Sequence, residues 1–262
     1  MIQMTETLAY CLRLAGIRTK QIAIALSFVT STLLISRLSN MFQAPLLGTL
    51  VDSAVMKGDA ASILQLEQGF RVIIFAGFLG VFIGAFLTPT ALVLFKKMIL
   101  RFKKKGSLPG IMISAFYPPN TVKIIKAFKW PRLGGLKNVK LSRLPKFFLT
   151  MNIFVASIHA IGVLCSLLAG AYLPEIRSTA NMLSGIVNGI ATVLLTMIVD
   201  PSGARITDEA VHGHRPESDV KAVVFFLQMG KLFGLLIVAQ LLIKPFTYYI
   251  MAVTRWIAGV AI

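Results

Sequence analysis

Acidic residues are scarce in this 262-residue chain, which contains 10 Asp and Glu but 27 Lys and Arg. Charged residues of both signs make up only 14% of the sequence, whereas hydrophobic residues make up 56%. Because charged residues form about 25% of an ordinary soluble domain, this composition argues against a soluble fold. No acidic residue occurs between Glu67 and Glu175, so the basic residues in that interval have no counter-charge nearby in the sequence.

The sequence also lacks the motifs of the common catalytic classes. It contains no nucleophile elbow, phosphate-binding glycine loop, zinc-binding helix motif or paired-carboxylate signature. Cys11 and Cys165 have no metal or redox spacing, and no further ligand follows His212 and His214 at a fixed spacing. We therefore expect no metal, no cofactor and no enzyme activity, although lipid-handling enzymes can use scattered residues that form no motif.

Long apolar runs dominate what the chain does contain. A run of about 20 apolar residues can cross a hydrocarbon layer about 30 Å thick. The runs predicted to span a membrane are 21–50, 71–95, 147–172, 181–199 and 220–243. Residues 1–17 are interpreted as a partial first helix, and 245–262 as a short final span or an interfacial helix. The predicted fold is all-α, a single polytopic transmembrane helical bundle with about six spans.

The segment 96–146 carries 14 of the 27 Lys and Arg and lies between two predicted spans. An excess of Lys and Arg in a loop is typical of the cytoplasmic side of a membrane, so we interpret it as a basic cytoplasmic loop. The same excess in a soluble protein would indicate nucleic acid, which the flanking apolar spans argue against. Alternation of the spans then places 51–70 and 173–180 outside the cell and 200–219 inside.

Within the basic loop, Val122, Ile125 and Phe128 recur at intervals of three beside a face of lysines. This pattern predicts a short amphipathic helix on the inner leaflet, where each cation adds about 1 kcal/mol of attraction to anionic lipid. Two roles remain open for the segment, namely topological anchoring and the gathering of anionic inner-leaflet lipids.

Arg37 is the only charge in the predicted span 21–50 and lies near its middle. An arginine at this depth costs about 2.5 to 3.5 kcal/mol on insertion scales, so it should face protein or a wet cavity. A polar stripe accompanies it on the same helix, formed by Thr32, Ser36, Asn40 and Gln43. We interpret Arg37, Asn40 and Gln43 as substrate-binding residues. The alternative is a structural arginine paired with a buried acid.

Lys231 lies near the middle of another predicted span, and Gln228 precedes it by about one turn on the same face. Two cations inside a helical bundle suit an anionic head group, for which a diphosphate is the first candidate. Asn188 belongs to a polar face that ends at Asp200 and that we expect to line a cavity. Gln228, Lys231 and Asn188 therefore join the predicted substrate-binding residues.

Four further residues are assigned supporting roles. Glu6 is seven residues from Arg13 on one helical face, but it could instead neutralise Arg37 or Lys231. Asp200 is the other candidate charge partner. His159 could relay protons, although a hydrogen bond to a neighbouring helix is the interpretation that we favour.

Glycine pairs spaced four residues apart permit close helix contact in lipid and only hint at a homo-oligomer. They are Gly80 and Gly84, Gly185 and Gly189, and Gly230 and Gly234.

Four stretches of the chain resemble the Amj family of lipid II flippases, an alternative to the MurJ flippase. They are SRLSNMFQAPLLGTLVD (36–52), LPKFFLTMNIF (144–154), YLPEIRSTANMLSGIVNGIATVLL (172–195) and DPSGARITDEAV (200–211). The resemblance covers nearly the whole chain. It implies a multi-pass protein of the bacterial cytoplasmic (inner) membrane that flips lipid II, the undecaprenyl-diphosphate-linked disaccharide-pentapeptide, to the outer leaflet for peptidoglycan synthesis.

Two rival functions stay open on the residues alone. An intramembrane enzyme acting on a lipid-diphosphate would need an acid near the cations, for which Asp200 and Glu6 are the candidates. A non-transporting membrane scaffold would use the basic loop to recruit lipid or partner proteins. Analysis of products would separate an enzyme from a transporter.

Overall fold

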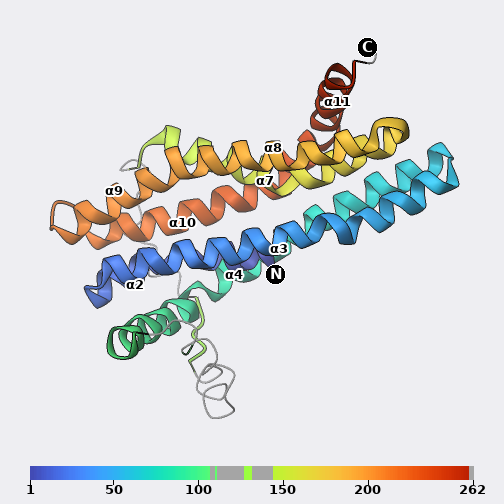
Figure 1. The fold of residues 1–262 in the computed structure, drawn as a ribbon. Helices are drawn as coiled ribbons and strands as arrows, with labels where there is room; N and C mark the ends of the chain where they lie inside the picture. The colour runs from blue at the N-terminus through green and yellow to red at the C-terminus, as the bar shows by residue number, and fades with distance from the viewer. Residues whose placement is uncertain (107–109, 111–126, 132–143, 260–262) are drawn as a thin grey trace. The chain divides into compact units, whose positions relative to one another are not determined.

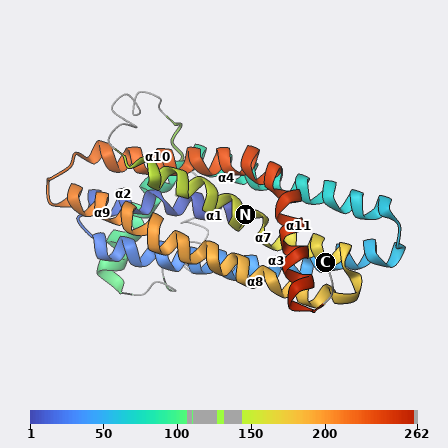
Figure 2. The same cartoon turned by 90° about the horizontal axis from the view of Figure 1, so that it is seen from above.

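The computed structural model describes residues 1–106, 110, 127–131 and 144–259, and these residues are almost entirely helical (Figures 1 and 2). No strand occurs among them, which confirms the predicted all-α class. Five helical segments in these ranges are long and apolar enough to cross a membrane: Ile22–Lys57, Ala60–Lys104, Lys146–Tyr172, Pro174–Val211 and Glu217–Ile257. The protein is therefore a polytopic helical membrane protein.

The helices follow one another along the chain with few connecting residues. The first four are α1 (Ile2–Ala9), α2 (Cys11–Thr19), α3 (Ile22–Lys57) and α4 (Ala60–Lys105). After the basic segment come α7 (Lys146–Tyr172), a 3-10 turn (Pro174–Ile176), α8 (Arg177–Leu194), a π-helical turn (Leu195–Val199) and α9 (Asp200–Val211). The last are α10 (Glu217–Phe233), a second π-helical turn (Gly234–Val238) and α11 (Ala239–Ile257).

Several helices extend beyond the predicted spans. Helix α3 continues through Pro45 to Lys57, so only Gly58 and Asp59 separate it from α4. The hydrogen bond from Ser62 lowers the pKa of the Asp59 carboxyl in this turn. Hydropathy locates the apolar part of a helix, whereas backbone hydrogen bonding carries the helix further. Because helix ends do not locate a membrane, the span boundaries stay predictions.

Five candidate spans lie within the described part of the chain, where about six were predicted for the whole chain. Residues 1–17 form two short helices divided at Tyr10, and neither is long enough to cross a membrane. The predicted segments 220–243 and 245–262 fall largely within one continuous helical segment, Glu217–Ile257. Pro45 and Pro245 do not end their helices, as is common in membrane helices, where neighbouring groups satisfy the carbonyl that a proline leaves free.

The chain divides into two compact units. The first unit comprises Met1–Ser36, Gly80–Pro145 and Pro201–Gln228, and the second comprises Arg37–Leu79, Lys146–Asp200 and Met229–Ile262. The single-domain assignment made from the sequence therefore stays a prediction.

The first unit has an apolar core and an ion-pair network. The core gathers residues of α1 to α4, including Leu12, Phe28 and Ile99, and Phe28 meets Phe102 edge-to-face at 5.2 Å. Arg18 of α2 pairs with Glu217 of α10 at 2.7 Å, and Glu217 also lies 3.2 Å from Lys221. The first of these pairs links α2 to α10, and the second lies within α10.

A described part of the basic segment packs on α4 in the first unit. The rings of Phe128 and Trp130 lie 6.5 Å and 5.4 Å from that of Phe86. The backbone N–H of Lys129 donates to Thr90 Oγ1 at 2.9 Å. The predicted amphipathic helix lies mostly outside the described residues, which omit Val122 and its neighbours, so it stays a prediction.

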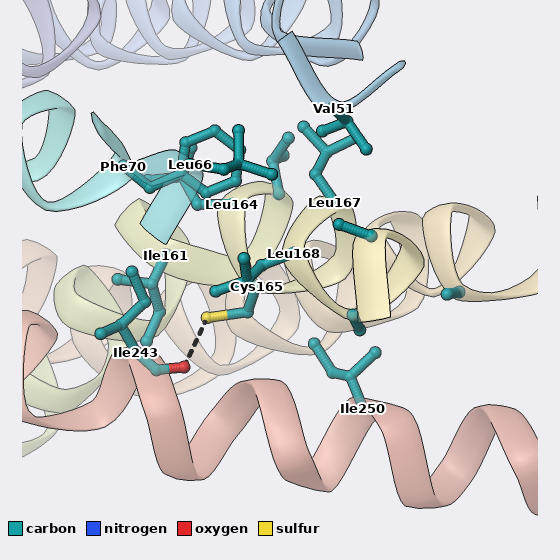
Figure 3. Packing of buried hydrophobic residues seen from close by; sticks show 14 of the residues in the cluster. Val51, Leu66, Phe70, Ile161, Leu164, Cys165, Leu167, Leu168, Ile243 and Ile250 are labelled. Carbon is teal, nitrogen blue, oxygen red and sulfur yellow. Dashed lines mark hydrogen bonds between the residues drawn. The ribbon is translucent and has the colours of Figure 1, made fainter. Parts of the chain in front are cut away.

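The core of the second unit surrounds α7, whose second half is buried on all sides (Figure 3). A helix that is apolar all round needs lipid or other helices to cover it. Side chains of α3, α4 and α11 do so, among them Val51, Phe70 and Ile250. Cys165 lies at the centre of this cluster and its thiol donates to the Ile243 carbonyl at 3.4 Å, as a small packing residue can.

Glycines of α7 bring α8 into close antiparallel contact. A Cβ atom at Gly170 would lie 2.6 Å from Asn181 Oδ1, and one at Gly162 would meet Asn188 Oδ1. Neither amide oxygen has a conventional hydrogen-bond partner within the described ranges. The adjoining glycine Cα–H groups offer the weak hydrogen bonds that recur at helix–helix contacts. The two ribbons run side by side in both views (Figures 1 and 2).

We expect Gly162→Ala to destabilise the protein by about 1 to 3 kcal/mol, because the new methyl group forces α7 and α8 apart. Gly185→Ala is the matched control, since a Cβ at Gly185 of α8 meets nothing within 4 Å. Thermal unfolding in detergent would measure both variants. Equal melting temperatures for the two would contradict the close contact.

Candidate functional site

Five of the six predicted substrate-binding residues belong to the second unit. Arg37, Asn40 and Gln43 lie on α3, Asn188 lies on α8, and Lys231 lies on α10. Gln228, the sixth, belongs to the first unit. The α3 residues and Asn188 are half-buried, whereas Lys231 is only 2% exposed.

Arg37 takes part in none of the ion pairs found between the described residues. The alternative role for Arg37, a structural pair with a buried acid, therefore has no acidic partner in the described part of the chain. The side chains around Arg37 on α3, including Leu34, Leu38 and Met41, are exposed apolar groups. A half-buried guanidinium beside them remains able to bind an anion.

Asn188 contributes to helix packing. Its amide oxygen faces Gly162, so the polar face of α8 turns toward α7. The opposite face of α8 is exposed and apolar, with Met182, Ile186 and Ile190. Periodicity in the sequence identifies a polar face but not the helix that this face contacts. In membrane proteins such a contact is often made to small residues, which allow two helices to approach closely.

Gln228 holds three helices of the first unit together. Its amide nitrogen donates to the Thr7 carbonyl at 3.2 Å and to Thr88 Oγ1 at 2.7 Å, which links α10 to α1 and α4. The side chain is buried, and leaving these groups unpaired there would cost about 1 to 3 kcal/mol each. The sequence could not distinguish this contact from a substrate contact.

The residues predicted to support the site lie as follows. Glu6 Oε1 accepts a hydrogen bond from Ser36 at 2.7 Å, within the first unit. The guanidinium of Arg13 is buried against Gly203 of α9. Asp200 is the first residue of α9, and His159 is half-buried on α7.

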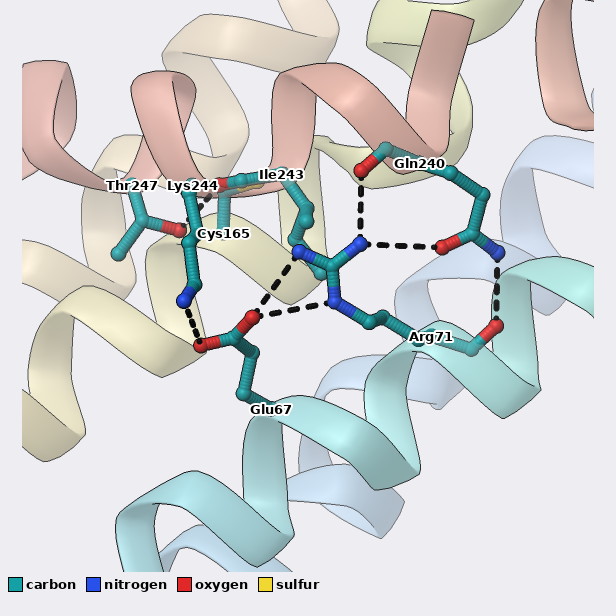
Figure 4. A network of polar contacts seen from close by, with 7 residues as sticks. All are labelled: Glu67, Arg71, Cys165, Gln240, Ile243, Lys244 and Thr247. Atoms are coloured by element: carbon teal, nitrogen blue, oxygen red, sulfur yellow. Dashed lines mark hydrogen bonds and ion pairs between the residues drawn. The ribbon is translucent and has the colours of Figure 1, made fainter. Parts of the chain in front are cut away.

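A polar network in the second unit was not anticipated from the sequence (Figure 4). Glu67 and Arg71 lie one turn apart on α4, with Glu67 Oε1 3.1 Å from Nε and 3.0 Å from Nη2 of Arg71. Arg71 Nη1 also donates to the Gln240 carbonyl at 2.8 Å, and Gln240 Nε2 donates back to the Arg71 carbonyl at 2.9 Å. Lys244 Nζ lies 3.5 Å from Glu67 Oε2.

This network sits where α11 is irregular. A π-helical turn ends at Val238, and Pro245 lacks the N–H that would continue the backbone ladder. Side chains donate to carbonyls here, since Arg71 reaches Gln240 and Cys165 reaches Ile243. The spacing of Glu67 and Arg71 signals an ion pair on one helix face, but nothing in the sequence indicates its partners on α11.

A groove of about 290 Å³ opens between the end of α3 and the start of α4. Its lining is mostly apolar, with Leu50, Leu66 and Phe70, and Lys57 also lines it. None of the residues predicted to bind substrate lines it. Small-molecule sites commonly measure about 300 to 1,000 Å³, so this groove lies at the small end of that range.

We expect Arg71→Lys to destabilise the protein by about 1.5 to 3 kcal/mol, since lysine keeps the charge but loses the fork that serves Glu67 and Gln240 together. Arg177→Lys is the matched control, because its 2.8 Å pair with Asp52 is exposed and contributes little. Melting temperatures in detergent would compare them, and similar small losses would argue against the network.

Nearly the whole chain is similar to known proteins. A relative named lipid II flippase Amj, from Bacillus subtilis (strain 168), is 35% identical over 257 residues, which cover 98% of this chain and 94% of the relative. No solved structure matches the chain significantly. The family model described as Amj, alternate to MurJ, matches residues 1–254, and the chain therefore belongs to the Amj family.

Proposed function

We propose that this protein is a lipid II flippase of the bacterial cytoplasmic membrane. The observation that carries this proposal is the 35% identity, over nearly the full length of both chains, to a relative of that name. The substrate would be the undecaprenyl-diphosphate-linked disaccharide-pentapeptide, carried from the inner to the outer leaflet for peptidoglycan synthesis. The five helical segments that can cross a membrane provide the required setting.

Transport of such a lipid is limited by its charged head. Moving an isolated charge into hydrocarbon costs many kcal/mol, so a transporter must supply cations and hydrogen-bond donors along the route. Arg37 suits this role because it is half-buried, lies on a candidate span and has no ion-pair partner among the described residues. Asn40 and Gln43 follow it along α3 and would bind polar groups of the head, while the polyprenyl chain stays in lipid.

Lys231 is the second cation assigned to this route. It is buried on α10 within a candidate span, three residues before the π-helical turn that starts at Gly234. Such turns frequently occur at functional sites. Asn188 and Gln228 are assigned supporting roles, because their amides already contact neighbouring helices.

The decisive experiment is complementation in a bacterium depleted of its own flippases. Cells expressing this protein should grow, and a toxin added outside them should cleave lipid II in the outer leaflet. A membrane-inserted protein that restores neither growth nor external cleavage would contradict the proposal and favour an enzyme or a scaffold.

In this assay, Arg37→Ala and Lys231→Ala should each reduce external cleavage to the level of depleted cells, because the diphosphate loses a cation on its route. Lys57→Ala is the matched control, since Lys57 lies exposed at the end of the same helix as Arg37. Membrane abundance and melting temperature would be measured for each variant. Full activity of either variant would remove that residue from the proposed site.

The basic segment separates transport from scaffolding. We expect neutral substitutions at Lys103, Lys104 and Lys105 to slow external cleavage several-fold by weakening attraction to anionic lipid, at about 1 kcal/mol per cation. Complete loss of complementation, with the protein still present in the membrane, would instead indicate a scaffold.

A further inference from the structure

Two cations of the second unit converge on one buried carboxylate. Glu67 is only 4% exposed, and its two oxygens face Arg71 and Lys244 separately (Figure 4). The three side chains carry a formal charge of +1. An excess cation in a membrane protein is costly unless an anion joins it, and such positions mark the paths of ions and substrates.

The two cations differ in how firmly they are held. Arg71 has five N–H groups, of which four point to Glu67, to the Gln240 carbonyl and, more weakly at 3.5 Å, to Gln240 Oε1. No described residue accepts from the fifth N–H, which is on Nη2. Arg71 is therefore a fixed cation with one donor to spare.

Lys244 is held much more loosely. Its ammonium lies 3.5 Å from Glu67, whereas charge-assisted hydrogen bonds are about 2.7 to 2.9 Å long, and 52% of its side chain is exposed. It can thus turn to a second anion at little cost. Tyr248, one turn further along α11, is exposed, as tyrosines at the depth of lipid head groups commonly are.

The position of Arg71 along the helices relates this cluster to Arg37. Helices α3 and α4 are antiparallel and joined at Gly58 and Asp59. At 1.5 Å per residue, Arg37 lies about 30 Å from the end of α3 and Arg71 about 17 Å from the start of α4. Arg71 is therefore about 13 Å nearer to the turn, on the side predicted to face outward.

We propose that Arg71 and Lys244 form a second binding step for the diphosphate head group, with Glu67 as the anion that holds the two cations when no lipid is present. This inference rests on the proposed flippase function. A phosphate oxygen takes Lys244 and the spare N–H of Arg71, while Glu67 keeps its bonds to the Arg71 fork. The negative charge of Glu67 limits how tightly the head group binds, which favours its release.

The test is a pair of variants with opposite expected effects. Lys244→Gln should weaken binding of polyprenyl diphosphate to the purified protein in nanodiscs about tenfold, since a charge-assisted bond is lost. Glu67→Gln should tighten binding several-fold, because a repelling charge is removed, and should slow transport by delaying release. Lys57→Gln serves as the matched control, with affinity and transport unchanged.

A purely structural network predicts a different result. If Arg71, Glu67 and Lys244 only stabilise the packing of α11, both variants lower the melting temperature. Their affinities for polyprenyl diphosphate would then not shift in opposite directions, and this result would overturn the inference. If Glu67→Gln fails to fold, the affinities of Lys244→Gln and Lys244→Arg for polyprenyl diphosphate are sufficient to test the inference. The proposal requires a tenfold loss for the first and near-normal affinity for the second.

Three further outcomes separate the possible sources of phosphate and distinguish this inference from the proposed flippase function. Phosphatidylglycerol binding as tightly as polyprenyl diphosphate would overturn the inference, because the site would then be one for bulk lipid. Unchanged affinity in Lys244→Gln, with normal transport by the unaltered protein, would overturn it while leaving the flippase function intact. If the unaltered protein does not transport the lipid at all, the flippase function itself is contradicted.

Discussion

The cost of placing charge in apolar surroundings governs the structure of this protein. Glu67 is buried in the second unit and is compensated by Arg71 on its own helix and Lys244 on another. Because a buried carboxylate without partners would be destabilising by several kcal/mol, this network fixes how α4 and α11 meet in that unit. Arg37 is the contrast, since it has no such partner among the described residues, and we propose that a substrate anion compensates its charge.

Close packing in the absence of a hydrophobic driving force is the second constraint. Lipid is as apolar as leucine, so helices associate through small residues that allow near approach and through polar groups between them. Helix α7 meets Gly230 and Gly234 through Asn152 and Ser157, and its own Gly162 and Gly170 admit asparagines of α8. Polar side chains in this unit therefore serve packing, and a polar face alone does not identify a substrate path.

Much of the fold could be predicted from composition and run length, but the site could be predicted only in part. The all-α class and the long apolar helices followed from hydropathy, whereas helix ends such as Lys57 did not, because hydrogen bonding continues past the apolar run. Arg37 was recognisable as a lone charge. The roles of Gln228 and Asn188 in helix packing could not be predicted, since periodicity identifies the polar face of a helix but not the helix that it contacts. Lys244, the partner of Glu67 on α11, lies more than 170 residues away in the sequence, so local patterns cannot reveal that pair.

The central claim is that this chain alone carries the lipid-linked precursor across a bilayer. The most direct test is to reconstitute the purified protein into sealed vesicles that contain fluorescent lipid II and to add a cleaving toxin outside. Flipping by the protein should expose the inner pool, so that cleavage exceeds the half that is accessible in empty vesicles, and Arg37→Ala should abolish this excess. Cleavage that stays at the level of protein-free vesicles, with correctly folded protein present, would contradict the account.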